Sequence, residues 1–151
     1  FIKCNQNNDF QITSSLIGEN SDVNRNCFSK IKKQIIDSTS FWDKIGIRRY
    51  STVYIPMDEA LSYSSVDISN RPYLVYNVNF ADEKIGSMST QMFKEFFRAF
   101  VNESKITLHI NLLYGENDHH KIESVFKSFA RALKEGSEVI SRDISSSKGV
   151  L

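Results

Sequence analysis

The stretch KITLHINLLYGENDHHKIESVFKSFARALKEG, residues 105–136, holds the clearest pattern in the chain and determines the expected fold. Apolar and polar side chains alternate through 105–114, which predicts a strand. From 118 to 136 the apolar side chains recur at helical spacing, so a helix follows, with Asp118 as its cap and Gly136 as its stop. The expected apolar stripe of this helix consists of Ile122, Val125, Phe126, Phe129 and Leu133. A strand followed closely by an amphipathic helix is typical of a layered α+β domain.

Two β-rich segments separated by a turn precede this unit. Residues 50–69 alternate in polarity, the sequence SNRP at 69–72 interrupts the pattern, and 73–80 resumes it with a period of two. We expect these two segments to form an antiparallel pair.

Residues 89–104 predict a second amphipathic helix, with Ser89 or Thr90 at its cap. Its apolar stripe is Met92, Phe93, Phe96, Phe97 and Phe100. The expected order from residue 50 to 136 is therefore β-β-β-α-β-α, an α+β layer with the helices packed on one face of the sheet.

The first 45 residues have a weaker pattern. Residues 9–18 are compatible with a strand, and 24–37 have helical spacing through Phe28, Ile31 and Ile35. A strand and a helix here would repeat the 105–136 unit in short and imperfect form, which points to an internal duplication.

Composition restricts the class of protein. The chain has 151 residues, about one domain, with 40% hydrophobic and 25% charged residues, as in an ordinary globular protein. A net charge of +1 gives no basis for binding nucleic acid or an anionic membrane. No apolar run approaches the roughly 18 residues of a membrane span, and the first residues do not have the pattern of a signal peptide. Cys4 and Cys27 do not make a disulfide framework, so a reducing, cytoplasmic setting is expected.

All three histidines, His109, His119 and His120, fall within twelve residues. On a helix His119 and Glu123 share a face, whereas His120 lies about 100° round, so the pair would serve two different ions. His109, on the preceding strand, is expected near the helix start. Imidazole and carboxylate ligands suit Mn, Fe, Co or Zn, and the absence of a nearby cysteine disfavours structural zinc. The alternative is a pair of solvated polar residues at an ordinary helix entrance.

The segment TLHINLLYGENDHHKIESVFKSFARALKEG (107–136), together with SSSKGVL (145–151), closely resembles imidazoleglycerol-phosphate dehydratase, a lyase of histidine biosynthesis. Further segments match this family in the same order: GIRRY at 46–50, PMDEAL at 56–61, VDISNRPYLVYNV at 66–78 and STQMFKEFFRAF at 89–100. The resemblance spans Gly46 to Leu151. The ending is similar to the bifunctional form, in which the dehydratase follows a histidinol-phosphatase domain.

The resemblance implies a tandem duplication of β/α half-domains (ribosomal protein S5 domain 2-like), with helices packed on four-stranded sheets. Here 1–45 would be a shortened, degenerate first half and 46–151 the second half with a phosphate-binding tail. The family assembles into trimers and a 24-subunit shell, with two manganese ions per subunit where subunits meet. The metal ligands that carry over are His109, His119, His120 and Glu123.

The resemblance also implies a site for the phosphate of the substrate, imidazoleglycerol phosphate, which loses water to give imidazole acetol phosphate. The phosphate-binding residues that carry over are Arg49, Arg71, Ser146 and Lys148. Guanidinium and ammonium groups suit a dianion, although the arginines could equally be surface charges and the tail a frayed terminus. Asn70 stands where the family has glycine, and asparagine tolerates positive φ.

The chain departs from the family where the first half should carry its own H-H-x-x-E-D motif. The sequence VNRNCF (23–28) occupies that place, with Val23 and Asn24 for the histidines and Cys27 for the glutamate. The family's catalytic glutamate would lie upstream of Phe1, so no catalytic residue is assigned. We therefore expect at most one weakly bound Mn²⁺ per chain. Three functions remain open: a dehydratase, an inactive assembly subunit of the same family, and a generic metal-binding protein.

Overall fold

A computed structural model describes residues 2–4, 10–12 and 46–140 of the chain. Between 46 and 140 a mixed sheet is formed from four strands: β3 (Tyr50–Met57), β4 (Ala60–Asp67), β5 (Tyr73–Asn77) and β8 (Thr107–Tyr114). A short hairpin, β6 (Lys84–Ile85) and β7 (Met88–Ser89), precedes α2 (Gln91–Ser104), and α3 (Asp118–Ser137) follows β8. The expected α+β class and the order β-β-β-α-β-α are confirmed, with the β6–β7 hairpin added.

The strand order is β3-β4-β8-β5, which corrects the expected pairing of 50–69 with 73–80. Residues 50–67 themselves form the antiparallel hairpin β3–β4, because Asp58, at a φ of 47°, reverses the chain. β5 does not join β4 but pairs in parallel with β8. The reason is the connection: α2 lies between β5 and β8 in sequence, and a crossover helix returns the chain in the same direction. Asn70 in the preceding turn has a φ of 61°, as expected for a residue in the place of glycine.

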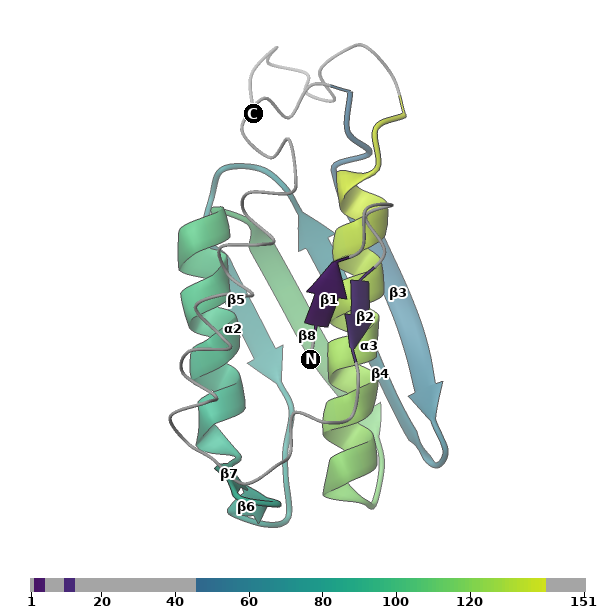
Figure 1. The fold of residues 1–151 in the computed structure, drawn as a ribbon, viewed down its shortest axis with the longest axis vertical. Coiled ribbons are helices and arrows are strands. Elements are labelled where there is room, and N and C mark those ends of the chain that lie inside the picture. The colour runs from purple at the N-terminus through teal and green to yellow at the C-terminus, as the bar shows by residue number, and fades with distance from the viewer. Residues whose placement is uncertain (1, 5–9, 13–45, 141–151) are drawn as a thin grey trace.

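Both helices cover one face of the sheet, with α3 over β3 and β4 and α2 beside β5 (Figure 1). Between the layers lies a core of apolar side chains in which aromatic rings from the two helices meet, such as Phe97 and Phe129 at a centroid distance of 5.3 Å. The expected stripe of α3 is buried throughout. That of α2 is correct except for Met92, which is 45% exposed.

α3 packs closely on the hairpin because the facing side chains are small. Ser62 and Ser64 on β4 meet Ser124 and Ser128 on α3 through hydroxyl contacts of 2.6 and 2.8 Å, all four being buried. Gly136, expected to stop the helix, is instead helical, and α3 continues to Ser137. A Cβ on Gly136 would lie 2.9 Å from the Val66 side chain, so its role is close packing.

The opposite face of the sheet is not covered by either helix. Strand residues alternate between the two faces, and Leu108 and Ile110 are fully buried toward the helices. The alternate positions include exposed aromatic side chains, Tyr50, Tyr54 and Tyr73. We call this surface the open face.

Near the N-terminus, β1 (Ile2–Cys4) and β2 (Phe10–Ile12) form an antiparallel pair, and β2 lies against α3. A strand expected within 9–18 is thus present at Phe10–Ile12, whereas the helix expected at 24–37 lies outside the described residues. None of the helices in the described part of the chain is long and apolar enough to cross a membrane.

Candidate functional site

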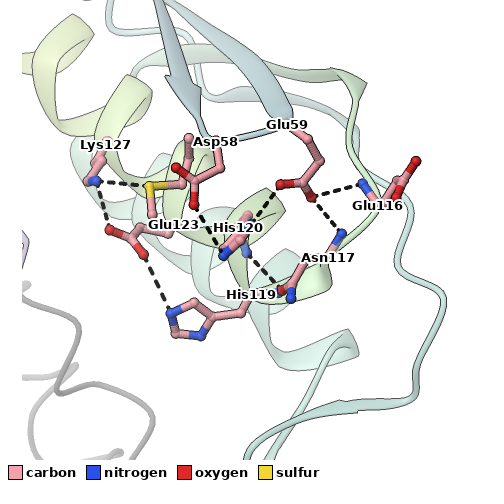
Figure 2. Close-up of polar contacts among 9 residues, drawn as sticks. Asp58, Glu59, Glu116, Asn117, His119, His120, Glu123 and Lys127 are labelled. Atoms are coloured by element: carbon pink, nitrogen blue, oxygen red, sulfur yellow. Dashed lines mark hydrogen bonds and ion pairs between the residues drawn. The ribbon is translucent and has the colours of Figure 1, made fainter.

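The start of α3 is held by the tip of the β3–β4 hairpin. The helix is capped by Asn117, whose side chain accepts hydrogen bonds from the backbone N–H groups of His119 and His120 at 2.9 and 3.3 Å. Glu59, at the hairpin tip, accepts hydrogen bonds from the backbone N–H groups of Glu116 and Asn117 through one carboxylate oxygen, at 3.1 and 2.7 Å. The hairpin tip therefore positions the first turn that carries the histidine pair (Figure 2).

Asp118, expected as the cap, has a different function. Its carboxylate accepts hydrogen bonds from the backbone N–H groups of Ala81 and Asp82, both at 2.8 Å, and pairs with Lys121 Nζ at 2.7 Å. Burial raises the pKa of Asp118, but the bonds from Lys121 and from the 81–82 backbone outweigh it, and the pKa is lowered overall. Because these contacts use the carboxylate, Asn117 takes over the capping position.

His120 faces the hairpin tip. Its Nδ1 lies 2.7 Å from the second carboxylate oxygen of Glu59, and its Nε2 lies 3.6 Å from Asp58 Oδ2 (Figure 2). The backbone N–H of Asn117, followed by the His120 ring, lowers the pKa of Glu59 to about 2, so this carboxylate is ionised. In turn the hydrogen bond to Glu59 raises the pKa of His120.

His119 points toward Glu123, as the helical spacing predicts. Its Nε2 lies 3.5 Å from one Glu123 oxygen, while Lys127 Nζ lies 2.7 Å from the other (Figure 2). The rings of His119 and His120 are 6.3 Å apart and inclined at 73°. The two histidines thus have different carboxylate partners, and the expectation that they serve different ions stays a prediction. We call Asp58, Glu59, His119, His120 and Glu123 the metal end.

His109 does not approach the helix start within one chain. It lies between the buried Leu108 and Ile110 on β8, so its side chain is on the open face, away from α3. Tyr114 is five positions further along β8, about 17 Å away. Its partner across the ladder is Ser65, two residues from Asp67 at the far end of β4.

The metal end has suitable donors but not enough of them. Imidazole nitrogens and carboxylate oxygens fit Mn²⁺ and neighbouring transition metals. However, no group of three or more His, Cys, Asp or Glu side chains close enough to hold an ion occurs among residues 2–4, 10–12 and 46–140. A complete site therefore needs ligands in addition to those that this part of the chain brings together.

The two expected phosphate-binding arginines meet at the opposite end of the hairpin. Arg49 Nε lies 2.9 Å from one oxygen of Asp67, and Arg71 Nη2 lies 3.6 Å from the other. Arg49 is mostly buried, whereas the Arg71 side chain is 75% exposed. Two guanidinium groups flank this carboxylate, and guanidinium groups are suited to binding an anion. We call Arg49, Asp67 and Arg71 the arginine end; Ser146 and Lys148 lie outside the described residues.

A family profile described as imidazoleglycerol-phosphate dehydratase matches residues 34–133, well over half of the chain. The chain belongs to the imidazoleglycerol-phosphate dehydratase family. Curated relatives with this name include a protein from Clostridioides difficile, 77% identical over 109 residues, and one from Caldicellulosiruptor saccharolyticus, 53% identical over 109 residues. These matches cover 72% of this chain but 57% and 56% of the relatives. The chain thus spans a little over half the length of the curated relatives it matches.

Solved structures of the family have the same fold. The dehydratase from Staphylococcus aureus superposes with a TM-score of 0.64 at 41% identity, covering 75% of this chain and 63% of that one. The dehydratase from Pyrococcus furiosus gives a TM-score of 0.70 at 34% identity, covering 83% of this chain and 70% of that one.

The two ends of the imidazoleglycerol-phosphate dehydratase unit are far apart within one chain. The 8 residues of β4 separate Glu59 from the end of the strand at Asp67, which is about 27 Å. α3 gives a similar length: its 20 residues span about 30 Å, and Gly136 near its end accepts a hydrogen bond from the backbone N–H of Arg49. His119 and His120 are therefore too far from Arg49 and Arg71 of the same chain for both groups to contact one small molecule.

Sequence reasoning did not assign a function to Asp58, Glu59 or Asp67. The signal for the first two was present, because PMDEAL at 56–61 places two carboxylates beside each other between two strand patterns. The contact between that turn and His120, however, depends on the hairpin reversal at Asp58.

Proposed function

We propose that this chain contributes to the dehydration of imidazoleglycerol phosphate to imidazole acetol phosphate, the reaction of histidine biosynthesis that its family name describes. The proposal is supported by family membership and by the presence of both required chemistries on one unit. The metal end supplies imidazole and carboxylate donors, and the arginine end supplies paired guanidinium groups. A cytoplasmic setting suits such an enzyme of amino-acid biosynthesis.

The metal end is the part that would hold the ion. His119 with Glu123 on one side, and His120 on the other, are the ligands we assign. A bound divalent ion such as Mn²⁺ supplies Lewis acidity and a template for the substrate's imidazole. The protein's own residues orient the donors: Glu59 and Asn117 fix the first helical turn, and Lys127 holds one oxygen of Glu123.

The arginine end would bind the phosphate. Arg71, the more exposed of the two, is assigned to direct contact, and Arg49, held by Asp67, supplies charge beside it. Ser146 and Lys148 would complete this site, as the family resemblance implies.

The separation of the two ends is the main observation in support of sites that are shared between chains. The imidazole and the phosphate of the substrate are joined by a three-carbon glycerol chain, which cannot bridge about 27 Å. We therefore propose that each site combines the metal end of one chain with the arginine end of another, in trimers and the larger 24-subunit shell. On this arrangement His109, on the open face near the arginine end, would be a metal ligand only across a chain boundary.

The departures at 23–28 limit the expected metal content. Val23, Asn24 and Cys27 replace two histidines and a glutamate, so we propose at most one weakly bound Mn²⁺ per chain. A catalytic base is not assigned to this chain.

The test is turnover of imidazoleglycerol phosphate by the full chain with added Mn²⁺, alongside metal analysis of the purified protein. We expect turnover that depends on Mn²⁺ and is lost in His119→Ala. Assembly without turnover would overturn the enzymatic proposal and support the second candidate, an inactive assembly subunit, which is favoured by the lack of a complete ligand group in the described residues. Metal binding by a chain that neither assembles nor turns over would support the third, a generic metal-binding protein.

A further inference from the structure

Glu59 is the central residue of a small hydrogen-bond network that includes His120. One carboxylate oxygen accepts hydrogen bonds from the backbone N–H groups of Glu116 and Asn117, and the other lies 2.7 Å from His120 Nδ1. The Asn117 side chain completes this network by accepting a hydrogen bond from the His120 backbone N–H. Thus the Glu59 carboxylate fixes both the turn before α3 and the imidazole ring of His120 (Figure 2).

The direction of the hydrogen bond to His120 follows from this arrangement. An ionised carboxylate can only accept, so the proton of a neutral His120 must lie on Nδ1. The lone pair is then on Nε2, which is directed away from Glu59. A histidine that binds a metal through one nitrogen needs the other to carry the proton and usually donates it to a carboxylate or carbonyl.

We propose that Glu59 is a positioning residue that fixes the tautomer of His120 and presents its Nε2 to the metal. The inference rests on the proposed function for the identity of the ion, but its geometric part is independent of it. Glu59 is not itself a ligand, because both of its oxygens are engaged by protein groups. His119 has no equivalent, since its Nε2, rather than its Nδ1, faces a carboxylate.

Glu59→Gln is the informative variant because it keeps the shape and reverses one hydrogen bond. The amide oxygen must remain opposite the two backbone N–H donors, so the NH₂ group faces His120 Nδ1. Nδ1 then has to accept, and the proton of a neutral His120 moves to Nε2, where it blocks metal binding. Asp58→Asn is the matched control: Asp58 also lies at the hairpin tip, but its carboxylate is 70% exposed and 3.6 Å from Nε2.

The experiment has two readouts on the full chain. The first is the ¹⁵N spectrum of the imidazole rings in metal-free protein, at a pH where His120 is neutral; His120→Gln and His119→Gln assign the signals. We expect protonated Nδ1 and bare Nε2 for His120, with this pattern reversed in Glu59→Gln and kept in Asp58→Asn. The second is titration with Co²⁺, followed by its absorption, for which Glu59→Gln should weaken binding by roughly 10- to 100-fold.

Thermal unfolding of the same proteins distinguishes positioning from a structural role. At a pH where His120 is neutral, Glu59→Gln keeps its backbone hydrogen bonds, so the unfolding temperature should stay near that of the parent while the tautomer changes. A protonated Nε2 on His120 in the parent, or an unchanged tautomer in Glu59→Gln, would overturn the inference. If the tautomers behave as expected but parent and variant bind Co²⁺ equally or not at all, the link to metal is wrong. If the tautomer and Co²⁺ results are as expected but the parent protein does not turn over imidazoleglycerol phosphate, the proposed function is wrong and this inference stands.

Discussion

The two ends of the β3–β4 hairpin differ in how their polar groups are held. At the metal end the ion pair of Asp118 and Lys121 is buried, and both oxygens of Glu59 have partners. At the arginine end, the Arg71 side chain is 75% exposed, and its Nη2 lies 3.6 Å from Asp67. The central carboxylate of the metal end is therefore held by protein groups, whereas the arginine end leaves a charged group in solvent. The two ends lie about 27 Å apart in one chain, which supports the proposal that each is part of a site completed by another chain.

The largest effect is expected from breaking the buried ion pair at the metal end. Asp118→Ala leaves Lys121 charged and buried and removes the acceptor of the Ala81 and Asp82 N–H groups. The free energy of unfolding should fall by about 3–5 kcal/mol, measured by urea denaturation. The control, Glu95→Ala, breaks an exposed pair with Arg98 and should cost less than about 0.5 kcal/mol. Equal effects of the two variants would contradict the view that the metal end is the rigid one.

Arg71→Ala tests the exposed charge at the other end. Because the side chain is 75% exposed, the unfolding free energy should hardly change. Binding of inorganic phosphate, measured by calorimetry, should weaken by about 1.5–3 kcal/mol, the usual contribution of a hydrogen bond to a charged group. Arg48→Ala, which removes another exposed arginine paired with Glu138, is the control and should leave phosphate binding intact. Phosphate binding that survives Arg71→Ala would remove the arginine end from the substrate site.

Two glycines, one near each end, provide a test of packing. A Cβ on Gly115 would lie 2.8 Å from Ala60 Cβ, 3.2 Å from Ala60 Cα and 2.9 Å from Lys121 Cγ, so Gly115→Ala should cost about 1–3 kcal/mol. Gly136→Ala meets one Val66 methyl group at 2.9 Å, and in a helix the exchange also gains up to about 1 kcal/mol of propensity. We expect its net effect on thermal unfolding to be small. A larger loss of stability for Gly136→Ala than for Gly115→Ala would contradict the expectation that the packing is tighter around Gly115.

The smallest expected effect is the pH dependence of the Glu59–His120 contact. The pKa of Glu59 is lowered from 4.5 to about 2, so its contribution to stability is present above pH 4.5 and lost as the pH falls toward 2. The pKa of His120 is raised from 6.5, so its contribution is present below pH 6.5 and lost as the pH rises through the higher value. The stability difference between the parent and Glu59→Gln should therefore be greatest between pH 4.5 and 6.5. A difference that is constant across these limits would show that the contact does not hold in solution.

Local patterns were sufficient for α2, α3, β5 and β8, but they did not predict the hairpin within 50–67 or the β6–β7 hairpin. The period of 3.6 placed Ile122, Val125 and Phe129 in the core because packing on one face is what stabilises a helix of this kind. The alternation on β8 was also sufficient to predict which face His109 lies on. Leu108 and Ile110, on either side of it, face the core, so His109 lies on the opposite face.

Features set by tertiary contacts could not be obtained in this way. Either Asn117 or Asp118 could cap α3 by sequence alone, and the choice depends on Asp118 binding the backbone of a distant loop. The neighbour of β5 depends on the crossover through α2, which a period of two does not encode. For the same reason the partnership of Glu59 and His120, 61 residues apart, became visible only in the folded chain.

The central claim is that a complete site combines the metal end of one chain with the arginine end of another. The direct measurement is turnover of imidazoleglycerol phosphate by assemblies in which His119→Ala and Arg71→Ala chains, carrying different affinity tags, are co-expressed and purified through both tags. Each variant alone should be much less active than the parent, whereas the mixed assembly should regain activity, because some of its sites receive an intact metal end and an intact arginine end. If the doubly purified assembly is no more active than the single variants while the parent is active, both ends of a site come from the same chain and the claim is wrong.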